Sequence, residues 1–254
     1  MEPTTTTTPS PISLTAPLGS TLGRRRLLAL VGGTVAAVVA GGRLASATTP
    51  DGGTAAACVE QPEETGGPFP GDGSNGPDIL TQQGAIRSDI RSNLDGSNTQ
   101  AGAPMTLQLT VTENCVPLSG AAVYVWHCNR DGDYSMYGSN ADQTWLRGVQ
   151  VADDAGALTF TTILPGRYSG RASHVHFRVY RDATLAEELL TSQMAFDDDT
   201  ADALYTAAAG YDDSLTNATH NATDNVFSDG VDTQLLTLTG DPTTAIVGTL
   251  QIGV

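Results

Sequence analysis

The chain contains no lysine, so its 12 basic residues are all arginines, against 28 aspartates and glutamates. The formal net charge of the 254 residues is −16. A surface of this sign repels the phosphates of nucleic acids and the head groups of anionic membranes. We therefore expect no nucleic-acid partner. The three cysteines, Cys58, Cys115 and Cys128, lie too far apart to form a zinc motif.

Long apolar runs are also scarce, and the one that stands out lies near the N-terminus. Three arginines at 24–26 precede an apolar run of roughly 14 residues, which is shorter than the roughly 20 residues of a membrane span. Ala-Ser-Ala at 45–47 suits a cleavage site. Residues 1–47 are thus predicted to be a cleavable twin-arginine (Tat) signal, the alternative being a retained anchor. We expect an extracellular or cell-envelope protein with no stable membrane insertion after cleavage.

Cleavage would remove four arginines and Glu2, taking the formal charge from −16 to about −19. Residues 48–57 are small and polar, which is typical of a flexible linker, and residues 58–254 suffice for one sizeable domain. Outside the cytoplasm one disulfide can form. Cys115 and Cys128 flank a single predicted strand, so a bridge from Cys58 to either of them is expected instead, and the choice between the two stays open.

Short alternating or β-branched stretches bounded by Gly, Pro, Asn or Asp predict strands. These stretches are 86–90, 105–112, 121–127, 157–163, 173–180, 189–196, 234–238 and 245–252. A short helix is predicted only at 200–209. Many short strands separated by turns predict an all-β fold, an antiparallel β-sandwich with long loops.

Residues 165–180 carry the most informative pattern. Val175, Phe177 and Val179 alternate with His174 and His176, so the strand is predicted to direct both imidazoles to one side. The two Cα atoms would lie roughly 6.5 to 7 Å apart, a separation that lets both imidazoles reach one metal ion. By itself the His-x-His pattern also suits an ordinary polar sheet face.

Two tyrosines follow turns close to this strand. Tyr134 comes after a predicted turn at 131–132, and Tyr168 comes after Pro165-Gly166. Two phenolate oxygens and two imidazole nitrogens would form a donor set that favours ferric iron. On the local pattern alone, both tyrosines could equally be ordinary turn residues.

A series of short motifs occurs in order along the chain. They are Thr-Gly-Gly-Pro-Phe at 65–69, Trp-His-Cys-Asn at 126–129, Gly-Asp-Tyr-Ser at 132–135, Leu-Arg-Gly at 146–148, Asp-Ala-Gly at 154–156, Thr-Thr-Ile-Leu-Pro-Gly-Arg-Tyr at 161–168, Arg-Ala-Ser-His-Val-His at 171–176 and Asn-Ala-Thr-Asp at 221–224. Together they resemble the intradiol ring-cleavage dioxygenases, and among these the exported branch that carries Trp-His-Cys. The resemblance covers nearly all of residues 58–254.

This resemblance implies a catalytic β-sandwich holding Fe(III) through Tyr134, Tyr168, His174 and His176, with a solvent hydroxide as a fifth ligand. The implied activity is O2-dependent intradiol cleavage of a catechol to a cis,cis-muconate in aromatic compound catabolism, with both atoms of O2 incorporated. The implied partners are therefore a small catechol and O2.

The resemblance also assigns roles to single residues. Tyr168 matches the ligand that a catechol displaces and that takes up a proton. Arg171 matches an arginine that stabilises negative charge developing on the substrate, and Gln193 matches a glutamine beside the site. His127 matches a position that does not bind iron, so we expect it to be buried and hydrogen-bonded. Cys128 is expected to pack or to form the disulfide.

Two other interpretations stay open. The chain could be a non-catalytic, exported β-sandwich that binds a ligand or a cell-surface partner. It could also be a copper oxidase or a zinc hydrolase that uses the His-x-His strand, although a zinc site would more often add a carboxylate and has no need of two tyrosines. Among catechols, the negative charge of the chain favours neutral rings over carboxylated ones.

Overall fold

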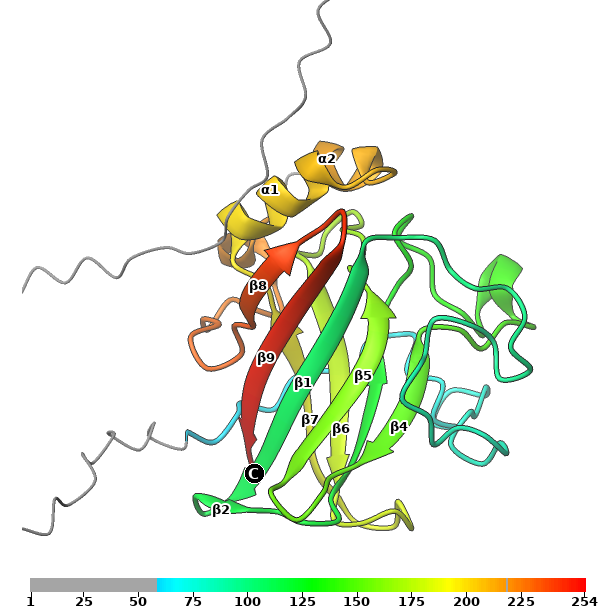
Figure 1. Cartoon of the computed structure of the whole chain (residues 1–254), viewed down its shortest axis with the longest axis vertical. Helices are drawn as coiled ribbons and strands as arrows, with labels where there is room; N and C mark the ends of the chain where they lie inside the picture. The colour runs from blue at the N-terminus through cyan, green and yellow to red at the C-terminus, as the bar shows by residue number, and fades with distance from the viewer. Residues whose placement is uncertain (1–58, 218) are drawn as a thin grey trace, which may run out of the picture. The chain divides into compact units, whose positions relative to one another are not determined.

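Alternating side chains along the strands create the core between two β-sheets. The computed structural model describes residues 59–217 and 219–254, so the predicted signal at 1–47, the linker at 48–57 and Cys58 lie outside the described residues. In the described part, one sheet has the strand order β2-β1-β9-β8, and its fifth strand, β5, also pairs with β1. The second sheet has the order β4-β3-β6-β7 and lies behind the first (Figure 1).

The strand bounds follow the predicted stretches closely. The first sheet contains β1 (Pro104–Glu113), β2 (Val116–Pro117), β5 (Ala157–Ile163), β8 (Thr237–Asp241) and β9 (Ala245–Gly253). The second sheet contains β3 (Ala122–Trp126), β4 (Arg147–Val151), β6 (His174–Tyr180) and β7 (Glu188–Ala195). The predicted all-β sandwich with long loops is therefore confirmed.

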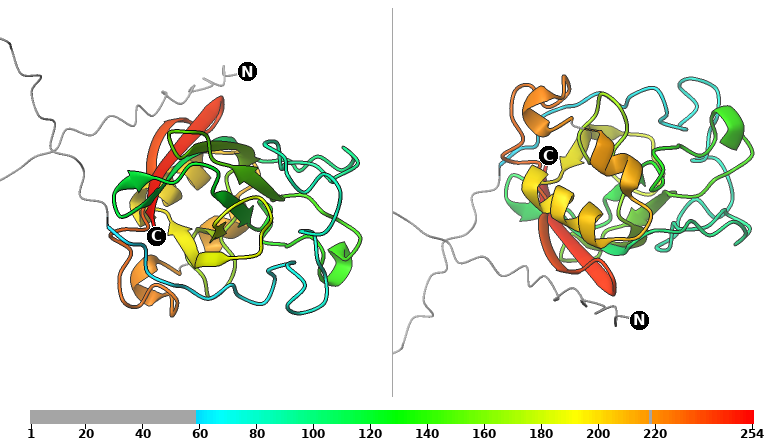
Figure 2. Two further views of the ribbon diagram at one scale, coloured as in Figure 1. Left: turned by 90° about the horizontal axis from the view of Figure 1, so that it is seen from below. Right: turned by 90° about the horizontal axis from the view of Figure 1, so that it is seen from above.

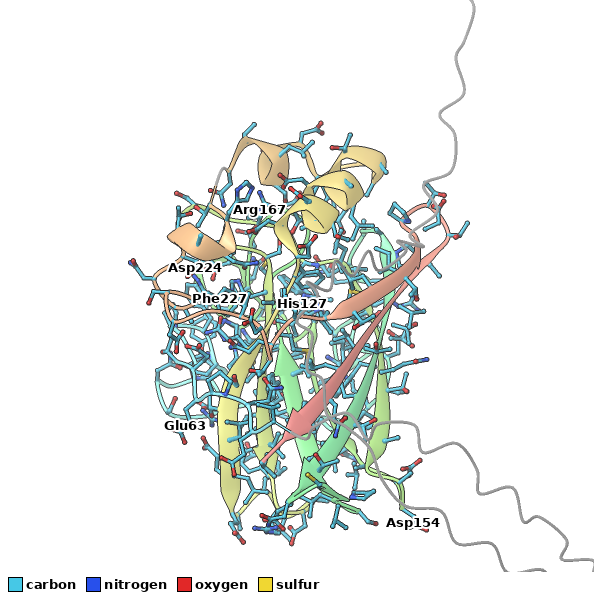
Figure 3. The ribbon with its side chains drawn as sticks, turned by 90° about the vertical axis from the view of Figure 1, so that its left-hand side faces the viewer. Glu63, His127, Asp154, Arg167, Asp224 and Phe227 are labelled. Atoms are coloured by element: carbon cyan, nitrogen blue, oxygen red, sulfur yellow. The ribbon has the colours of Figure 1, made fainter. Side chains whose placement is uncertain are left out.

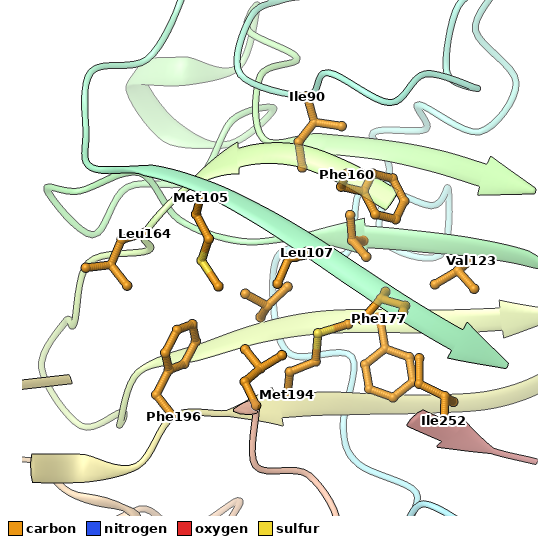
Figure 4. Packing of buried hydrophobic residues seen from close by; sticks show 14 of the residues in the cluster. Ile90, Met105, Leu107, Val123, Phe160, Leu164, Phe177, Met194, Phe196 and Ile252 are labelled. Carbon is orange, nitrogen blue, oxygen red and sulfur yellow. The ribbon is translucent and has the colours of Figure 1, made fainter. Parts of the chain in front are cut away.

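The core fills the space between the sheets with one residue parity from each strand. Leu107 and Phe160 from the first sheet meet Val123, Phe177 and Met194 from the second, and all five side chains are buried (Figure 4). Burial of this apolar surface is the main stabilising contribution to the fold.

One strand pair departs from the antiparallel expectation. β1 and β9 run parallel, from Met105 opposite Ile246 to Thr112 opposite Gly253, whereas the other pairs between named strands are antiparallel. Parallel neighbours require a long crossover connection. The chain between β1 and β9 provides it, since it builds the whole second sheet and both helices before returning.

Two α-helices lie over one end of the strands (Figure 2, right). They are α1 (Asp198–Ala207) and α2 (Asp212–Thr216). Two short 3-10 turns also occur, η1 (Gly138–Asn140) between β3 and β4 and η2 (Asn221–Thr223) after α2. The predicted helix at 200–209 begins two residues early because Asp197 caps it, its carboxylate accepting from the Thr200 amide at 3.0 Å. Within the described residues, no helix has the length and apolarity needed to cross a membrane.

Two strand predictions were wrong in detail. Residues 86–90 form only isolated bridges, Ile86 to Val149 of β4 and Asp89 to Thr161 of β5, because this segment spans the open edge between the two sheets. The stretch predicted at 234–238 becomes a strand only from Thr237, and neither β2 nor β4 was predicted. Local alternation cannot distinguish a segment that pairs with one sheet from one that passes between two.

The outer face of the second sheet is covered rather than exposed. Tyr124, Trp126 and Tyr180 on that face pack with Tyr134 and Met136 in a second buried cluster. The buried guanidinium of Arg147 holds the covering loop in place, donating to the carbonyl oxygens of Phe69 at 2.8 Å and Pro70 at 3.0 Å. The face that carries His174 and His176 is thus closed off from water.

We predict that Leu107→Ala destabilises the protein by about 2 to 5 kcal/mol, because it leaves a cavity in the core between the sheets. Gln108→Ala is the matched control, since Gln108 points outward from the same strand and is exposed; it should change stability by less than about 0.5 kcal/mol. Urea unfolding measures both. Equal losses of stability for the two variants would contradict the assignment of Leu107 to the side of β1 that faces the core.

Candidate metal centre

The start of β6 places two buried imidazoles at the helical end of the sandwich. His174 is 1% exposed and His176 is 2% exposed. The Nδ1–H of His174 donates to the Ala172 carbonyl oxygen at 2.7 Å, and this hydrogen bond assigns the proton to Nδ1. The Nε2 lone pair of His174 is therefore free to bind a metal ion.

A tight turn brings Tyr134 to the same place. The Asn129 side-chain oxygen accepts from the backbone amides of Asp131 at 3.0 Å and Asp133 at 2.9 Å, which fixes the turn after β3. The loop that carries Tyr168 packs against this turn at Gly166, where a Cβ atom would lie 2.3 Å from the Arg130 carbonyl oxygen. Only glycine permits this approach, and it sets Tyr168 opposite Tyr134.

Three donor atoms then converge. The Oη atoms of Tyr134 and Tyr168 each lie 3.2 Å from Nε2 of His174, and they lie 3.5 Å from each other. Donor atoms bound to one ion at about 2.0 to 2.2 Å lie about 3 to 3.5 Å apart. The spacing of these atoms therefore fits a single metal ion.

Stacking, rather than a hydrogen bond, orients His176. Its ring lies parallel to that of Trp126, with centroids 4.9 Å apart and planes 4° apart, and Trp126 in turn stacks on Tyr124. Nδ1 of His176 is buried and has no hydrogen-bond partner. Gly67 borders the ring edge, where a Cβ atom would lie 3.2 Å from Cε1 of His176. The loop at 65–69 therefore closes directly over this imidazole.

Burial shifts the pKa values of all four side chains towards their neutral forms. It raises the pKa of Tyr134 well above its usual value and also raises the pKa of Tyr168. Burial and then the charge of Arg171 lower the pKa of His174 to about 3, while burial and then His174 hold that of His176 well below its usual range. Two phenols can ionise here only when a cation compensates their charge.

Arg171 and Gln193 lie beside these donors. Nη1 of Arg171 is 3.3 Å from Nε2 of His174, and Nη2 donates to Oε1 of Gln193 at 2.6 Å. Gln193 donates from Nε2 to the Thr65 carbonyl oxygen at 2.8 Å, linking the arginine to the loop that covers the site. The structure thus brings together all six predicted site residues.

His127 is buried and hydrogen-bonded, as expected: it is 1% exposed and contacts the Cys128 carbonyl oxygen and Thr162 Oγ1, both at 2.7 Å. It directly follows β3 and continues the parity of Val123 and Val125, which point between the sheets, so it faces away from the converging donors. Cys128 is buried, and its thiol donates to the Gly166 carbonyl oxygen at 3.2 Å. Cys115 is exposed, and the structure does not join it to Cys128. Whether Cys58 pairs with either stays a prediction.

Several residues that shape the site carried no predicted role. They are Trp126, which stacks on His176; Arg147, which anchors the covering loop; Phe69, whose ring lies 5.0 Å from that of Tyr134; and Asp224, which pairs with Arg171 at 2.8 Å. All four belong to the quoted motifs. Asp224 and Phe227 lie near the helical end of the molecule, far from Asp154 at the opposite end (Figure 3).

No three His, Cys, Asp or Glu side chains within 59–217 and 219–254 lie close enough to share a metal ion. The cluster at the start of β6 instead combines imidazoles with phenols. This donor chemistry suits a hard, highly charged cation.

Comparison with known proteins identifies the family. The sequence profile of a family described as "Dioxygenase" matches residues 74–235, well over half of the chain. The chain belongs to the intradiol ring-cleavage dioxygenase family. Its fold is also that of an intradiol ring-cleavage dioxygenase from Tetranychus urticae, with a TM-score of 0.62 and 24% identity over 77% of this chain and 94% of that one. The dioxygenase domain of a carbohydrate-binding fusion protein from Streptomyces sp. SirexAA-E aligns with a TM-score of 0.52 and 23% identity, covering 77% and 98% of the two chains.

Curated relatives in the family match shorter stretches. A chlorocatechol 1,2-dioxygenase from Rhodococcus opacus is 33% identical over 86 residues, which is 26% of this chain and 34% of the relative. A catechol 1,2-dioxygenase from Acinetobacter lwoffii is 30% identical over 138 residues, which is 46% of this chain and 43% of the relative. The chain thus spans less than half the length of these two relatives.

We predict that the metal-free protein loses stability as the pH falls from 6.5 to about 4, in part because His127 is buried in its neutral form. Burial lowers the pKa of His127 to about 4, below the roughly 6.5 of the unfolded chain. The unfolded state therefore binds more protons in this window, and the contribution of His127, present above pH 6.5, is lost at about 1.4 kcal/mol per pH unit.

His127→Gln should remove the contribution of His127 to this pH dependence. Its free energy of unfolding in urea should therefore decline less steeply between pH 6.5 and 4. Because carboxylates and the other histidines titrate in both proteins, the difference between the two curves isolates His127. Parallel curves would contradict the depressed pKa.

Proposed function

We propose that the chain is an Fe(III)-dependent dioxygenase that cleaves a catechol ring between its two oxygen-bearing carbons to yield a cis,cis-muconate. One observation carries this proposal. Two phenol oxygens and an imidazole nitrogen converge within 3.5 Å of one another in a buried site, next to a guanidinium. Family membership supports it, and the family relatives named catechol 1,2-dioxygenase suggest the substrate class.

In this proposal Tyr134, Tyr168, His174 and His176 hold the ion. Bound Fe(III) would draw electron density from a coordinated catechol and make its ring reactive towards O2. The neutral imidazoles offer lone pairs, and the phenols release their protons when the ion binds. The cover of residues 65–69 and the buried cluster around Trp126 keep bulk water out, which strengthens the electrostatic interactions inside the site.

Tyr168 and Arg171 have the active roles towards the substrate. Tyr168 is only half-buried whereas Tyr134 is 5% exposed, so Tyr168 is the phenol that an incoming catechol can reach. Its Oη atom takes up a catechol proton, and Nη1 of Arg171 donates to negative charge that develops on the substrate oxygen. Both atoms of O2 enter the product and one carbon–carbon bond breaks, so the overall reaction needs no external reductant.

The visible absorption spectrum tests this proposal first. The protein loaded with Fe(III) should show a broad tyrosinate-to-iron band that moves to longer wavelength when catechol is added without oxygen. Tyr168→Phe should weaken or shift this band, because one of two tyrosinate donors is lost. Tyr137→Phe is the matched control: Tyr137 lies close by, but its hydroxyl pairs with Gly71 and Asn75 instead of the converging donors.

A protein that stays colourless after ferric reconstitution would overturn the proposal and favour a non-catalytic binding module. A coloured protein in which Tyr137→Phe removes as much of the band as Tyr168→Phe would instead contradict the ligand assignment.

We further propose that the natural substrate is an uncharged catechol. Arg171 is neutralised by Asp224, and Glu64 lies near the same network, accepting from Gln234 at 3.3 Å while Gln234 donates to the Gln193 carbonyl oxygen at 3.1 Å. The pKa of Glu64 is raised overall, because the effects of burial and of nearby Asp229 outweigh the lowering by the Gln234 hydrogen bond. A carboxylated ring would meet an excess of negative charge here.

Accordingly, Glu64→Gln should raise kcat/KM for protocatechuate about two- to fourfold at low salt, the size expected for removing one charge at such range. The value for catechol should change less. Glu63→Gln is the control, since Glu63 is the exposed neighbouring carboxylate. A wild type that prefers protocatechuate to catechol would contradict the proposed substrate class.

For localisation we propose export by the Tat pathway, with cleavage after residue 47. The arginines at 24–26 and the apolar run after them support this. Tat transport moves folded proteins, which is compatible with a metal ion inserted before export.

A further inference from the structure

The Arg171 guanidinium is held on three sides. Its Nε donates to both carboxylate oxygens of Asp224, at 3.0 and 2.8 Å, and its Nη2 donates to Gln193. The Phe227 ring lies beneath it, with the guanidinium carbon 5.6 Å from the ring centroid. Only Nη1 points to the converging donors, 3.3 Å from Nε2 of His174.

All the acceptor positions of the Asp224 carboxylate are occupied by hydrogen bonds to Arg171 and to neighbouring backbone amides. Besides the two contacts with Arg171, its Oδ2 accepts from the Ala172 amide at 2.8 Å and its Oδ1 accepts from the Val226 amide at 2.9 Å. An ionised carboxylate offers about four acceptor positions. The side chain is fully buried, at 0% exposure. Asp224 therefore has no oxygen lone pair left for a metal ion or a substrate.

The two sets of contacts act on the same short segment. Ala172 is the residue whose carbonyl oxygen fixes the tautomer of His174, and its amide is bound by Asp224. Arg171 precedes it directly. A single carboxylate thus sets both the backbone that leads into β6 and the direction of the guanidinium.

We propose that Asp224 is a positioning residue that aims Nη1 of Arg171 at the substrate side of the metal centre. This inference rests on the proposed function, because the substrate is what the guanidinium would meet. Without Asp224, Nε would lose its acceptor, and only Gln193 and the Phe227 ring would still restrain the guanidinium. An arginine aimed in advance stabilises developing charge without reorganising during the reaction.

The chain offers a matched comparison in a second buried Arg–Asp pair. Arg171 and Asp224 are 15% and 0% exposed at a separation of 2.8 Å, and Arg178 and Asp72 are 16% and 3% exposed at 2.6 Å. Asp72 makes no contact with the converging donors; its other hydrogen bonds go to Ser74. Arg178 keeps a second carboxylate partner, Glu188 at 3.3 Å, so Asp72→Asn reports the effect of losing one buried aspartate partner of an arginine away from the converging donors.

The experiment compares Asp224→Asn and Asp72→Asn in the iron-loaded protein, measuring iron content, urea stability, catechol affinity from the anaerobic spectral shift, and kcat. We expect both variants to lose stability and to keep their iron. Asp224→Asn should weaken catechol binding or lower kcat about 10- to 100-fold, the usual range for a residue that orients another functional group at a metal site, while Asp72→Asn changes either by less than about threefold.

A double-mutant cycle with Arg171→Leu decides whether Asp224 acts through the arginine. In the Arg171→Leu background, Asp224→Asn should have almost no further effect on catechol affinity. Independent, multiplying losses would overturn the proposal, as would a loss of iron from Asp224→Asn that accounts for the lost activity.

Arg171→Lys covers the case in which Asp224→Asn does not fold. A lysine keeps the charge but has one nitrogen, which cannot pair with Asp224 and face the substrate together. It should therefore lose catechol affinity, and undiminished affinity would overturn the positioning role. If the wild-type protein binds catechol without cleaving it, the proposed function is refuted, but the double-mutant cycle still tests the positioning role of Asp224. If the wild-type protein does not bind catechol, the proposed function and the positioning role are both refuted.

Discussion

Removal from water of the four side chains proposed to bind the metal ion is the constraint on which the rest of the structure depends. Burial favours the protonated phenols of Tyr134 and Tyr168 and the neutral imidazoles of both histidines, so these four side chains carry no charge in the absence of a cation. Such a site is stable only if its cover is held firmly. Arg147 does this from beneath, since it is 0% exposed and its guanidinium binds two carbonyl oxygens of the covering loop and Ser135 beside Tyr134. The Arg147 side chain thereby joins the covering loop to the segment that carries Tyr134.

The directions of the strand residues could be predicted from the sequence because they follow from a local period. Alternation along 174–180 correctly places Val175 and Phe177 in the core and both histidines on the opposite face. The same period explains why His127 points away from the site although it neighbours Trp126. Local alternation contains no information about what covers a face. The pattern alone also suited an ordinary polar sheet face, whereas residues near the start of the described chain cover that face.

Roles that depend on contacts between distant segments could not be predicted in this way. Asp224 reaches Arg171 from 53 positions along the chain, and Arg147 reaches Phe69 from 78 positions. Both lie in motifs that support the family resemblance, so their presence was visible and their function was not. The parallel pairing of β1 with β9 has the same origin, because its register is set by the long path that the chain takes between them. The segment at 86–90 has the sequence pattern of a strand because a segment that bridges two sheets needs an extended backbone, just as a strand within one sheet does.

The hydrogen bonds from Asp224 through Arg171 and Gln193 to Thr65 also connect the electrostatics of the site to its cover. Thr65 lies two residues before Gly67, which borders His176, so the loop that excludes water is bonded to the guanidinium that would meet the substrate. Displacement of this loop would admit water and at the same time release Gln193 from one of its partners. Because a guanidinium in a wet site is screened and free to turn, exclusion of water and orientation of Arg171 are not separate properties of this protein. Residues 65–69 contribute to both, because the Thr65 carbonyl oxygen holds the Gln193 side chain that accepts from Arg171.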